Sequence, residues 1–333
     1  MKNTNEKPST KEISFVVQGA VDQESTPICI MSIRKHFPAS QIILSTWEGS
    51  NTTGLDYDKV IVNKDPGGFV DKKNKRCYNN VNRQIVSSFN GLKEVQTEYA
   101  VKIRSDLMLT SNRFVKFFGK YQRRTEDFKI FENRIITYCF TSKFSLGMEI
   151  TPFCISDWFY FGKSSDLVKL FDIPLNPDEN DLYFNELFPD NAPKHGTFSS
   201  KPLRYFPEQY IGYAKFSQYY PEVHFGHRFC NDDEIVDISN HFISNNFLML
   251  SHFQLPVYLL KNNRCEYFGS DYSYWKRAIN FFQWEELYKK YCCPDHIANV
   301  FKKALYVYWV KSIYKYSFIQ NALRSRYSKI TEP

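Results

Sequence analysis

The chain has 333 residues, of which 43% are hydrophobic, and a modest net charge of +7. This length can bury the core of one large domain, or of one domain with a helical appendage. Membrane-spanning and secreted proteins are disfavoured, because no run of about 18 uncharged apolar residues occurs and the polar residues 1–12 lack the apolar core of a secretory signal. None of the eight cysteines forms a C-x-x-C pair, so a structural zinc site has no support and a reduced, intracellular chain is expected.

Strand-like and helix-like segments alternate over the first 110 residues. Runs rich in β-branched residues predict strands at 13–17, 41–46, 59–63 and 99–103. Thr26 and either Asn79 or Asn80 are suited to begin the intervening helices as N-caps, and a proline follows Thr26 at the favoured first helical position. This alternation predicts an α/β fold, in which a mostly parallel central sheet carries helices on its faces.

The rest of the chain is predicted to add strands and then helices. Three further strands are expected, at 128–131, 134–140 and 154–162, and Ser164 or Ser165 is expected to cap the next helix. Residues 172–200 have the composition of a loop with a short helix, and the pattern from about residue 270 is helical to the end. The predicted organisation is a disordered lead over 1–11, a nucleotide-binding domain over 12–265 and a helical region over 266–333.

Polar side chains follow directly after the predicted strands of the first half. Parallel α/β sheets bind ligands in the crevice outside the carboxyl ends of their strands. The residues expected to converge on this rim are Gln18, Trp47, Glu48, Asp65 and Asp106. Gln18 precedes a glycine that permits close approach of a nucleotide, while Trp47 and Glu48 offer a stacking ring and a carboxylate to a nucleoside. A tryptophan in such a loop can equally serve packing alone.

A largely apolar strand ends abruptly at Arg104, Ser105 and Asp106. A divalent ion such as Mg²⁺ or Mn²⁺ prefers oxygen ligands and often shares them with substrate phosphates. Asp106 is therefore the predicted metal ligand, and the ion would neutralise charge on a departing diphosphate. Arg104 and Ser105 are predicted to contact the ligand that carries the diphosphate. Arg104 would either pair with a phosphate or hold Asp106 in place. In the competing interpretation, Asp106 only caps the next turn and Arg104 pairs with it.

A second candidate group surrounds the start of the predicted helix near residue 80. The backbone N–H groups of a helix start favour an anion, and Asn79 and Arg83 share one helix face. Together with Asn82 they are predicted to hold a diphosphate or the hydroxyls of a donor sugar. The alternative is an ordinary asparagine cap beside a solvated arginine.

Two carboxylates are candidates for a general base, which transfer of a sugar to an alcohol needs if configuration inverts. Asp157 is flanked by apolar residues and so requires a partner, while Glu208 lies in an irregular aromatic stretch that can face an acceptor. Of the two, Glu208 is favoured. Either carboxylate can instead make a structural hydrogen bond.

The basic charge is concentrated at the C-terminus. Residues 297–333 carry seven Lys or Arg against one Glu, a net +6, so the remainder is close to neutral. Aromatic and aliphatic residues recur there at helical spacing among the lysines. A basic amphipathic helix over 297–330 suits an anionic membrane surface. The alternative is a helix that packs this face on the core and leaves its lysines solvated.

Several short segments together resemble the WavE lipopolysaccharide-synthesis family. They are VVQG at 16–19, SIRKHFP at 32–38, ILSTWEG at 43–49, NNVNRQI at 79–85, KIRSDL at 102–107, SDWFYFG at 156–162 and PEQY at 207–210. The resemblance implies a glycosyltransferase of the GT-A type that acts on bacterial surface polysaccharide. It places Asp106 at the metal-binding acidic motif, which is often D-x-D. Arg104 stands in place of the first Asp, so a later His or Asp would have to assist Asp106.

The sequence therefore predicts a metal-dependent glycosyltransferase of the cytoplasm, peripheral on the inner membrane. Its expected partners are a nucleotide-sugar donor, a glycan or lipid-linked glycan acceptor and the inner-membrane surface, but no nucleic acid. One alternative is a nucleotidyltransferase, although the loop over 20–26 is acidic and lacks the glycines that such enzymes use. The other alternative is a non-catalytic module that binds membrane or nucleic acid through its tail.

Overall fold

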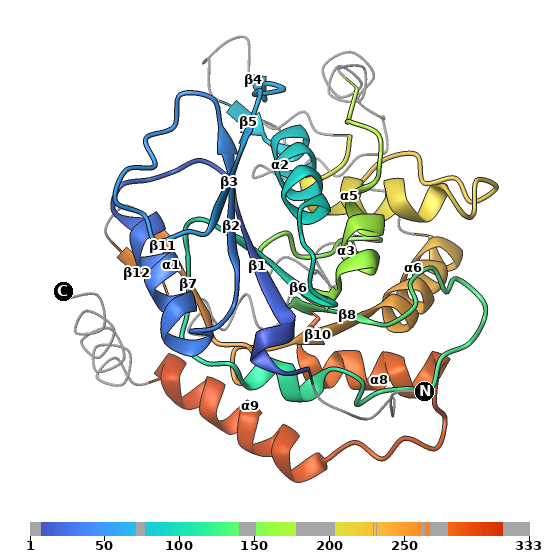
Figure 1. Cartoon of the computed structure of the whole chain (residues 1–333). Coiled ribbons are helices and arrows are strands. Elements are labelled where there is room, and N and C mark those ends of the chain that lie inside the picture. The colour runs from blue at the N-terminus through green and yellow to red at the C-terminus, as the bar shows by residue number, and fades with distance from the viewer. Residues whose placement is uncertain are drawn as a thin grey trace.

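The computed structural model describes residues 8–70, 77–139, 151–177, 204–228, 230, 232–261, 264–266 and 279–315. At its centre is a seven-stranded sheet with the strand order β10-β8-β9-β6-β1-β2-β3 (Figure 1). Its strands are β1 (Ile13–Gln18), β2 (Ile42–Trp47), β3 (Lys59–Asn63), β6 (Tyr99–Arg104), β8 (Ile135–Tyr138), β9 (Phe159–Lys163) and β10 (Phe247–Leu250). Only β9 runs antiparallel to its neighbours within this sheet. The predicted α/β fold with a mostly parallel sheet is confirmed.

Helices cover both faces of the sheet and bury its inner strands, while the edge strand β3 stays partly exposed. The described α-helices are α1 (Ser25–His36), α2 (Val81–Lys93), α3 (Ser164–Phe171), α5 (Pro207–Ser217), α6 (Asp233–Asn246), α8 (Phe281–Tyr291) and α9 (Val300–Lys315). Two 3-10 turns are η1 (Thr10–Glu12) and η2 (Arg113–Phe117). On one face, Val16 of β1 lies against α2. On the other face, the ring centroid of Phe15 lies 4.8 Å from that of Phe37, directly after α1. Successive side chains of a strand thus point to opposite faces of the sheet and pack against different helices.

Two small sheets complete the domain. The strands β7 (Leu107–Leu109), β11 (Val257–Lys261) and β12 (Arg264–Glu266) form an antiparallel sheet beside α1, and β4 (Phe69–Val70) pairs with β5 (Cys77–Asn79). Because β7 follows β6 after only two residues, the chain turns sharply at Ser105 and Asp106. No helix in the described residues is both long and apolar enough to cross a bilayer.

The first four predicted strands match β1, β2, β3 and β6 to within one residue at each end. The predicted N-cap of α1 is wrong. The carboxylate of Asp22 accepts hydrogen bonds from the backbone N–H groups of Glu24 and Ser25, at 3.2 and 2.7 Å. Thr26 instead accepts a hydrogen bond from the N–H of Asp22 through its hydroxyl, at 3.0 Å. A nearby aspartate therefore supplies the acceptor that helix starts require.

The predicted strand at 128–131 is wrong. Phe128 has a φ of 56°, and the side-chain oxygen of Asn246 accepts from the N–H groups of Ile130 and Phe131, at 2.8 and 3.2 Å. A side-chain amide at the end of α6 thus takes the hydrogen bonds that a neighbouring strand would otherwise supply.

Three other predictions for the second half need correction or stay open. The strand predicted at 154–162 begins later, at Phe159. Ser164 is the first residue of α3 and donates its hydroxyl to the carbonyl of Thr97, at 2.7 Å, instead of capping the helix. The loop beyond residue 177 and the tail beyond residue 315 lie outside the described residues, and the domain boundary at 265 stays a prediction.

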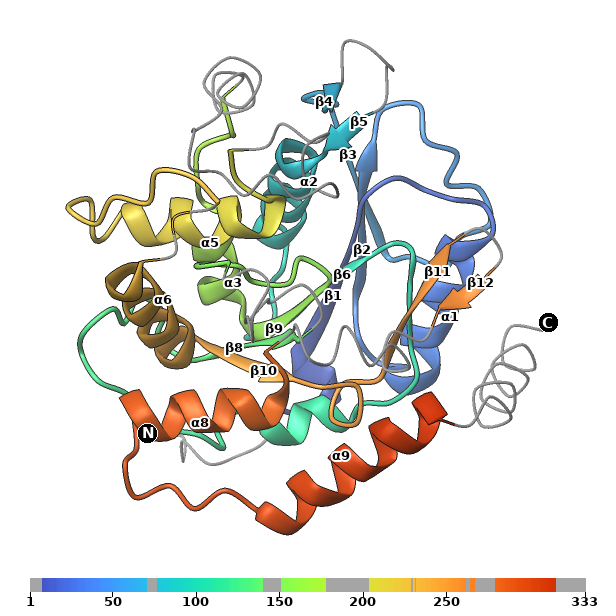
Figure 2. The same ribbon diagram turned by 180° about the vertical axis from the view of Figure 1, so that it is seen from behind.

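The segment before β9 is fixed by its contact with α5, which lies beside α2 and α3 (Figure 2). Gly212 of α5 meets this segment so closely that a Cβ atom there would lie 2.1 Å from the carbonyl oxygen of Phe153. Gln209 donates its side-chain amide to the carbonyl of Pro152, at 3.0 Å, and Ile155 N–H donates to the carbonyl of Glu208, at 3.3 Å. These contacts set the position of α5 relative to residues 152–158.

Substituting Gly212→Ala should destabilise the fold, although alanine is the better helix former. The added methyl group meets backbone, which cannot rotate away, so we expect a loss of about 1–3 kcal/mol in the free energy of unfolding. Urea denaturation measures this value. Gly162→Ala in β9 is the matched control, since a Cβ atom there has only ordinary contacts, the nearest at 3.6 Å. Equal stability of the two variants would show that α5 can move away from the segment at no cost.

Candidate functional site

The carboxyl ends of β1 and β6 lie side by side, as the rim prediction requires. Gln18 and Arg104 are partners in the register of the two strands. The N–H of Ser105 donates to the carbonyl of Gln18 at 2.9 Å, and the hydroxyl of Ser105 donates to the carbonyl of Ala20 at 2.6 Å. Gly19 has a φ of 123°, and a Cβ atom there would lie 3.2 Å from the Ser105 hydroxyl. Glycine is favoured in such a conformation, so these residues hold the loop after β1 tightly against the end of β6.

Arg104 is the centre of a charged cluster at this rim. Its guanidinium makes two hydrogen bonds to the carboxylate of Asp106, at 3.0 and 2.6 Å. A third nitrogen lies 3.7 Å from the carboxylate of Asp157, and the guanidinium lies 5.7 Å from the ring centroid of Trp158. Burial lowers the pKa of Arg104, but Asp157, Asp106 and Glu208 more than offset it, so the pKa lies above its ordinary value.

Glu208 joins this cluster from α5. It lies in the first turn of that helix and is half-buried. Burial raises the pKa of the Tyr160 hydroxyl, and the negative charges of Asp157 and Glu208 raise it further. The structure thus brings the two predicted base candidates, Asp157 and Glu208, close to the predicted donor residue Arg104.

Lys102 lies beneath the cluster in the middle of β6, and its side chain is fully buried. Its ammonium group donates a hydrogen bond to the backbone carbonyl of Asp157. It also lies 5.6 and 5.8 Å from the ring centroids of Tyr160 and Phe171. Burial lowers the pKa of Lys102 to about 7, although Asp157 and Asp106 act in the opposite direction. Lys102 is not among the predicted site residues, although a lysine inside an apolar central strand is an unusual feature that a sequence alone reveals.

Three buried polar atoms near the cluster have no hydrogen-bond partner among the described residues. They are the side-chain carbonyl oxygen of Gln18, one carboxylate oxygen of Asp157 and the hydroxyl of Tyr160. Buried polar groups are nearly always paired in proteins, so such exceptions need an explanation. Such atoms also occur elsewhere in the described structure, Arg124 Nε and Trp284 Nε1 among them, and those near Arg104 are ones that a polar ligand could satisfy.

Asp106 is the predicted metal ligand, and the described residues contain no group of three or more His, Cys, Asp or Glu side chains that could hold a metal ion. Mg²⁺ sites often use only one or two carboxylates and complete their shell with water and substrate phosphate. Asp106 and Asp157 approach Arg104 together, and the unpartnered oxygen of Asp157 is an acceptor that suits a cation. Both carboxylate oxygens of Asp106 already accept hydrogen bonds from Arg104, so a metal shared with a phosphate would also have to use the unpartnered oxygen of Asp157.

The predicted donor residues Asp65 and Arg83 pair with each other near the start of α2. Two guanidinium nitrogens of Arg83 lie 2.8 and 2.7 Å from the two carboxylate oxygens of Asp65, and a third donates to the side chain of Asn80 at 2.8 Å. The hydrogen bond from Arg83 lowers the pKa of Asp65. The pair is partly exposed, so it presents both charges to solvent.

The two predicted asparagines have structural contacts at the same helix start. The side-chain oxygen of Asn79, which is buried, accepts from the N–H of Val81 at 2.9 Å. Asn82 exchanges two hydrogen bonds with the backbone of Asn176, at 3.0 and 2.7 Å. The N-cap residue Asn80 makes no side-chain capping hydrogen bond, so Asn79 supplies the acceptor from one position earlier, and Asn82 ties α2 to the loop after α3.

The last two predicted donor residues follow the second strand. Trp47 ends β2 and is half-buried, and Glu48 is exposed. The N–H of Glu48 donates to the carbonyl of Asn63 at the end of β3, at 2.9 Å. Because β1, β2 and β3 are parallel, these residues lie at the same edge of the sheet as Gln18.

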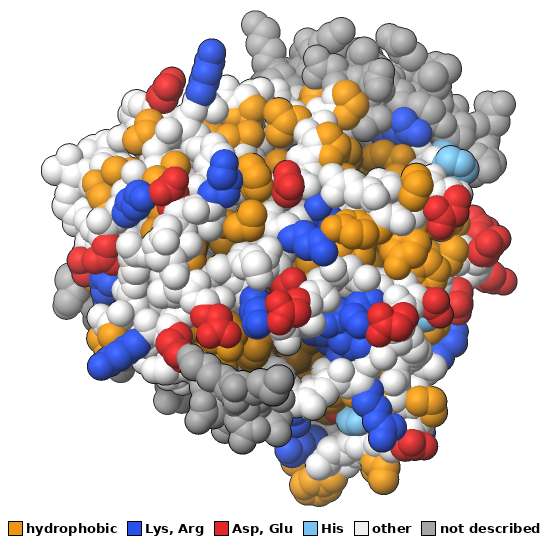
Figure 3. All heavy atoms as spheres, turned by 45° about the vertical axis from the view of Figure 1, so that its right-hand side comes forward, with side chains coloured by type: hydrophobic (Ala, Val, Ile, Leu, Met, Phe, Trp, Pro, Cys, Tyr) orange, Lys and Arg blue, Asp and Glu red, His pale blue; other side chains and the backbone are white. Residues whose placement is uncertain are grey.

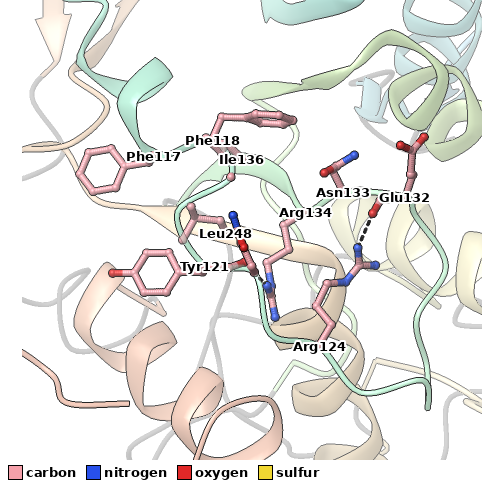
Figure 4. A pocket seen from close by; sticks show the side chains of 11 residues that line it. Phe117, Phe118, Tyr121, Arg124, Glu132, Asn133, Arg134, Ile136 and Leu248 are labelled. Atoms are coloured by element: carbon pink, nitrogen blue, oxygen red, sulfur yellow. Dashed lines mark hydrogen bonds between the residues drawn. The ribbon is translucent and has the colours of Figure 1, made fainter. Parts of the chain in front are cut away.

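A cavity of about 280 Å³ lies elsewhere, beside the start of β8 (Figure 4). Arg124 and Arg134 line it and donate to backbone carbonyls, Arg124 to those of Phe131 and Glu132 and Arg134 to that of Ser244 among others. None of the predicted site residues lines this cavity. The arginines of this cavity stabilise neighbouring loops through these hydrogen bonds. The charged cluster around Arg104 lies at the opposite, carboxyl end of the strands.

A family model described as WavE lipopolysaccharide synthesis matches residues 13–318. The chain belongs to the WavE lipopolysaccharide synthesis family. The match spans every strand of the central sheet and both groups of candidate site residues. The resemblance found in the short segments is thereby confirmed, and membership of the WavE family gives the chain a role in lipopolysaccharide synthesis. Among curated proteins, none matches the chain significantly.

The buried ammonium of Lys102 should make stability depend on pH. Its pKa is about 7 in the folded chain against an ordinary value of 10.5. Between these values the unfolded chain binds a proton that the folded chain lacks, so the free energy of unfolding rises with pH. The free energy of unfolding of the wild type should therefore rise relative to that of Lys102→Met from about pH 7 to pH 10, by up to about 1.4 kcal/mol per pH unit. Urea denaturation at several pH values measures it, and a constant difference would contradict a neutral buried amine.

Proposed function

We propose that this WavE family member is a glycosyltransferase. It moves a sugar from a nucleotide donor, a UDP-sugar, to a glycan or lipid-linked glycan acceptor in the synthesis of lipopolysaccharide or capsule. The proposal rests on one observation, the cluster of Arg104 with Asp106 and Asp157 at the carboxyl end of β6. Ligands of parallel α/β sheets bind at this edge, and family membership supplies the polysaccharide context. The proposed location is the cytoplasmic face of the inner membrane.

The diphosphate of the donor is proposed to bind beside Arg104. Guanidinium groups pair with phosphate oxygens as they do with carboxylates. Asp106 and Asp157 are the residues that would hold a divalent cation, Mn²⁺ or Mg²⁺, together with the diphosphate. When bound, such an ion stabilises the charge that develops on the leaving diphosphate. Ser105 supports this arrangement by fixing the loop after β1.

The remaining rim residues are proposed to surround the nucleoside and the donor sugar. Gln18 has a buried side-chain oxygen without a partner in the described structure, which suits a base or ribose. Trp47 offers a ring face and Glu48 an exposed carboxylate at the next strand end. The Asp65–Arg83 pair, with the neighbouring Asn79 and Asn82, is proposed to face the sugar or the diphosphate.

The transfer step needs a group that accepts the proton of the acceptor hydroxyl. In an inverting reaction the hydroxyl oxygen bonds to the anomeric carbon, the bond to the diphosphate breaks, and its electron pair leaves with the nucleoside diphosphate. We assign the base to Glu208, because it is half-buried while Asp157 is almost wholly buried beside Arg104. Asp157 is the alternative base.

Donor binding is tested by thermal shift and calorimetry against nucleoside diphosphates and nucleotide-sugars, with and without Mn²⁺. The expected result is metal-dependent binding of UDP or a UDP-sugar that is lost in Asp106→Asn. Asp237→Asn is the control, since this exposed carboxylate also sits in an ion pair, with Lys290. Binding of a nucleoside triphosphate with release of pyrophosphate would favour a nucleotidyltransferase, and no response to any nucleotide would contradict the proposal.

The base is tested by the rate at which the nucleoside diphosphate is released from the donor found in that screen. Glu208→Gln should lower turnover by about 10²–10⁴-fold while donor affinity changes little. Asp157→Asn should weaken donor binding as well, because Asp157 contacts Arg104. Glu222→Gln, an exposed glutamate after α5, serves as the control. Unchanged turnover in Glu208→Gln would show that Glu208 is not the base and would favour Asp157 in that role.

A further inference from the structure

The helix α9 turns an apolar face toward solvent. Five side chains at its N-terminal half and just before it are exposed, namely Ile297 (89%), Val300 (74%), Phe301 (71%), Leu305 (51%) and Tyr308 (73%). Within the helix, residues 301, 305 and 308 follow the spacing of one helix face, and Ile297 comes just before it. The space-filling view shows hydrophobic side chains at the lower edge of the molecule, at the height of α9 in Figure 1 (Figure 3). For this part of the helix, packing of the apolar face on the core is ruled out.

The opposite side of α9 is fastened to the domain by polar contacts. Lys303 forms an ion pair with Glu286 of α8. Just before the helix, His296 lies 3.3 Å from Glu285, and Asp295 pairs with Arg123 at 3.2 Å. The apolar face therefore points outward because the polar side is the one that is attached.

The charge of residues 297–333 bears on which partner binds the exposed apolar face of α9. Residues 297–333 carry a net charge of +6, and no acidic residue occurs in them before Glu332. A second copy of the chain would bring the same positive charge to the contact, and like charges repel. An anionic bilayer attracts basic segments and accepts aromatic and aliphatic side chains at the level of its headgroups.

We propose that α9 docks on the surface of an anionic lipid bilayer through Ile297, Phe301, Leu305 and Tyr308. The helix lies in the plane of the interface, and the net positive charge of residues 297–333 favours anionic lipid. This inference extends the proposed function by naming a partner surface, but the docking itself does not depend on sugar transfer.

Cosedimentation of the full chain with vesicles tests the proposal. Wild-type protein should bind vesicles of equal parts phosphatidylethanolamine and phosphatidylglycerol, and it should bind phosphatidylcholine vesicles far less. The combined variant Phe301→Ser, Leu305→Ser and Tyr308→Ser should bind the anionic vesicles with an affinity lower by a factor of about ten or more. The control variant combines Met31→Ser with Val62→Ser, two side chains of similar exposure (58% and 57%) away from α9, and it should bind as the wild type does.

Two further measurements separate the competing explanations. Lys302→Glu, at an exposed position of the same helix, should weaken binding to anionic vesicles and reduce its dependence on salt. Light scattering reports the molar mass. A wild-type dimer that becomes monomeric in the triple variant, with no vesicle binding, would overturn the proposal in favour of a second copy.

The failure of docking can be told apart from failure of the proposed function. Nucleotide binding, measured by thermal shift in the same triple variant, should equal that of the wild type, because α9 is remote from the rim at β6. Wild-type protein that ignores anionic vesicles, or a triple variant that binds them normally, would overturn the docking proposal whatever the nucleotide result.

Discussion

The burial of two basic side chains in β6 is the constraint on which the candidate site depends. Lys102 is fully buried and Arg104 largely so, and burying a cation is costly unless carboxylates and hydrogen bonds compensate for it. The compensating groups come from three separate segments: Asp106 after β6, Asp157 before β9 and Glu208 on α5. The close contact of α5 with residues 152–158 therefore has an electrostatic consequence, because it keeps Asp157 near Lys102 and Arg104, and Glu208 near Arg104.

A fold selected for stability alone would not place these groups together. An apolar residue at position 102 would cost less, and the unpartnered oxygens of Gln18, Asp157 and Tyr160 forgo hydrogen bonds that water would supply. Departures from the rules of protein interiors are expected at functional sites, where the ligand completes the missing interactions.

The sequence predicted the first half of the sheet well, because strand patterns and the rule for strand ends are local or generic. It selected Asp106, Asp157 and Glu208 as separate candidates, but the pairing of Asp157 with Arg104 depends on a contact across more than 50 residues and could not be derived from spacing. The same limit explains the missed role of Asn246, which replaces a strand partner for residues 130–131. Lys102 was missed for another reason. The rule that ligands bind at strand ends does not select a charged residue in the middle of a strand.

The position of α9 relative to the rim constrains the acceptor. Figures 1 and 2 place α9 below the sheet, whereas the carboxyl ends of β1, β2 and β3 point to the opposite side. The six residues of β1 alone span about 20 Å. If α9 rests on a bilayer, an acceptor anchored in that bilayer has to extend at least this far to reach Arg104. Taken together, the two proposals therefore predict a glycan that has already been lengthened as the acceptor, rather than a first sugar attached directly to the lipid.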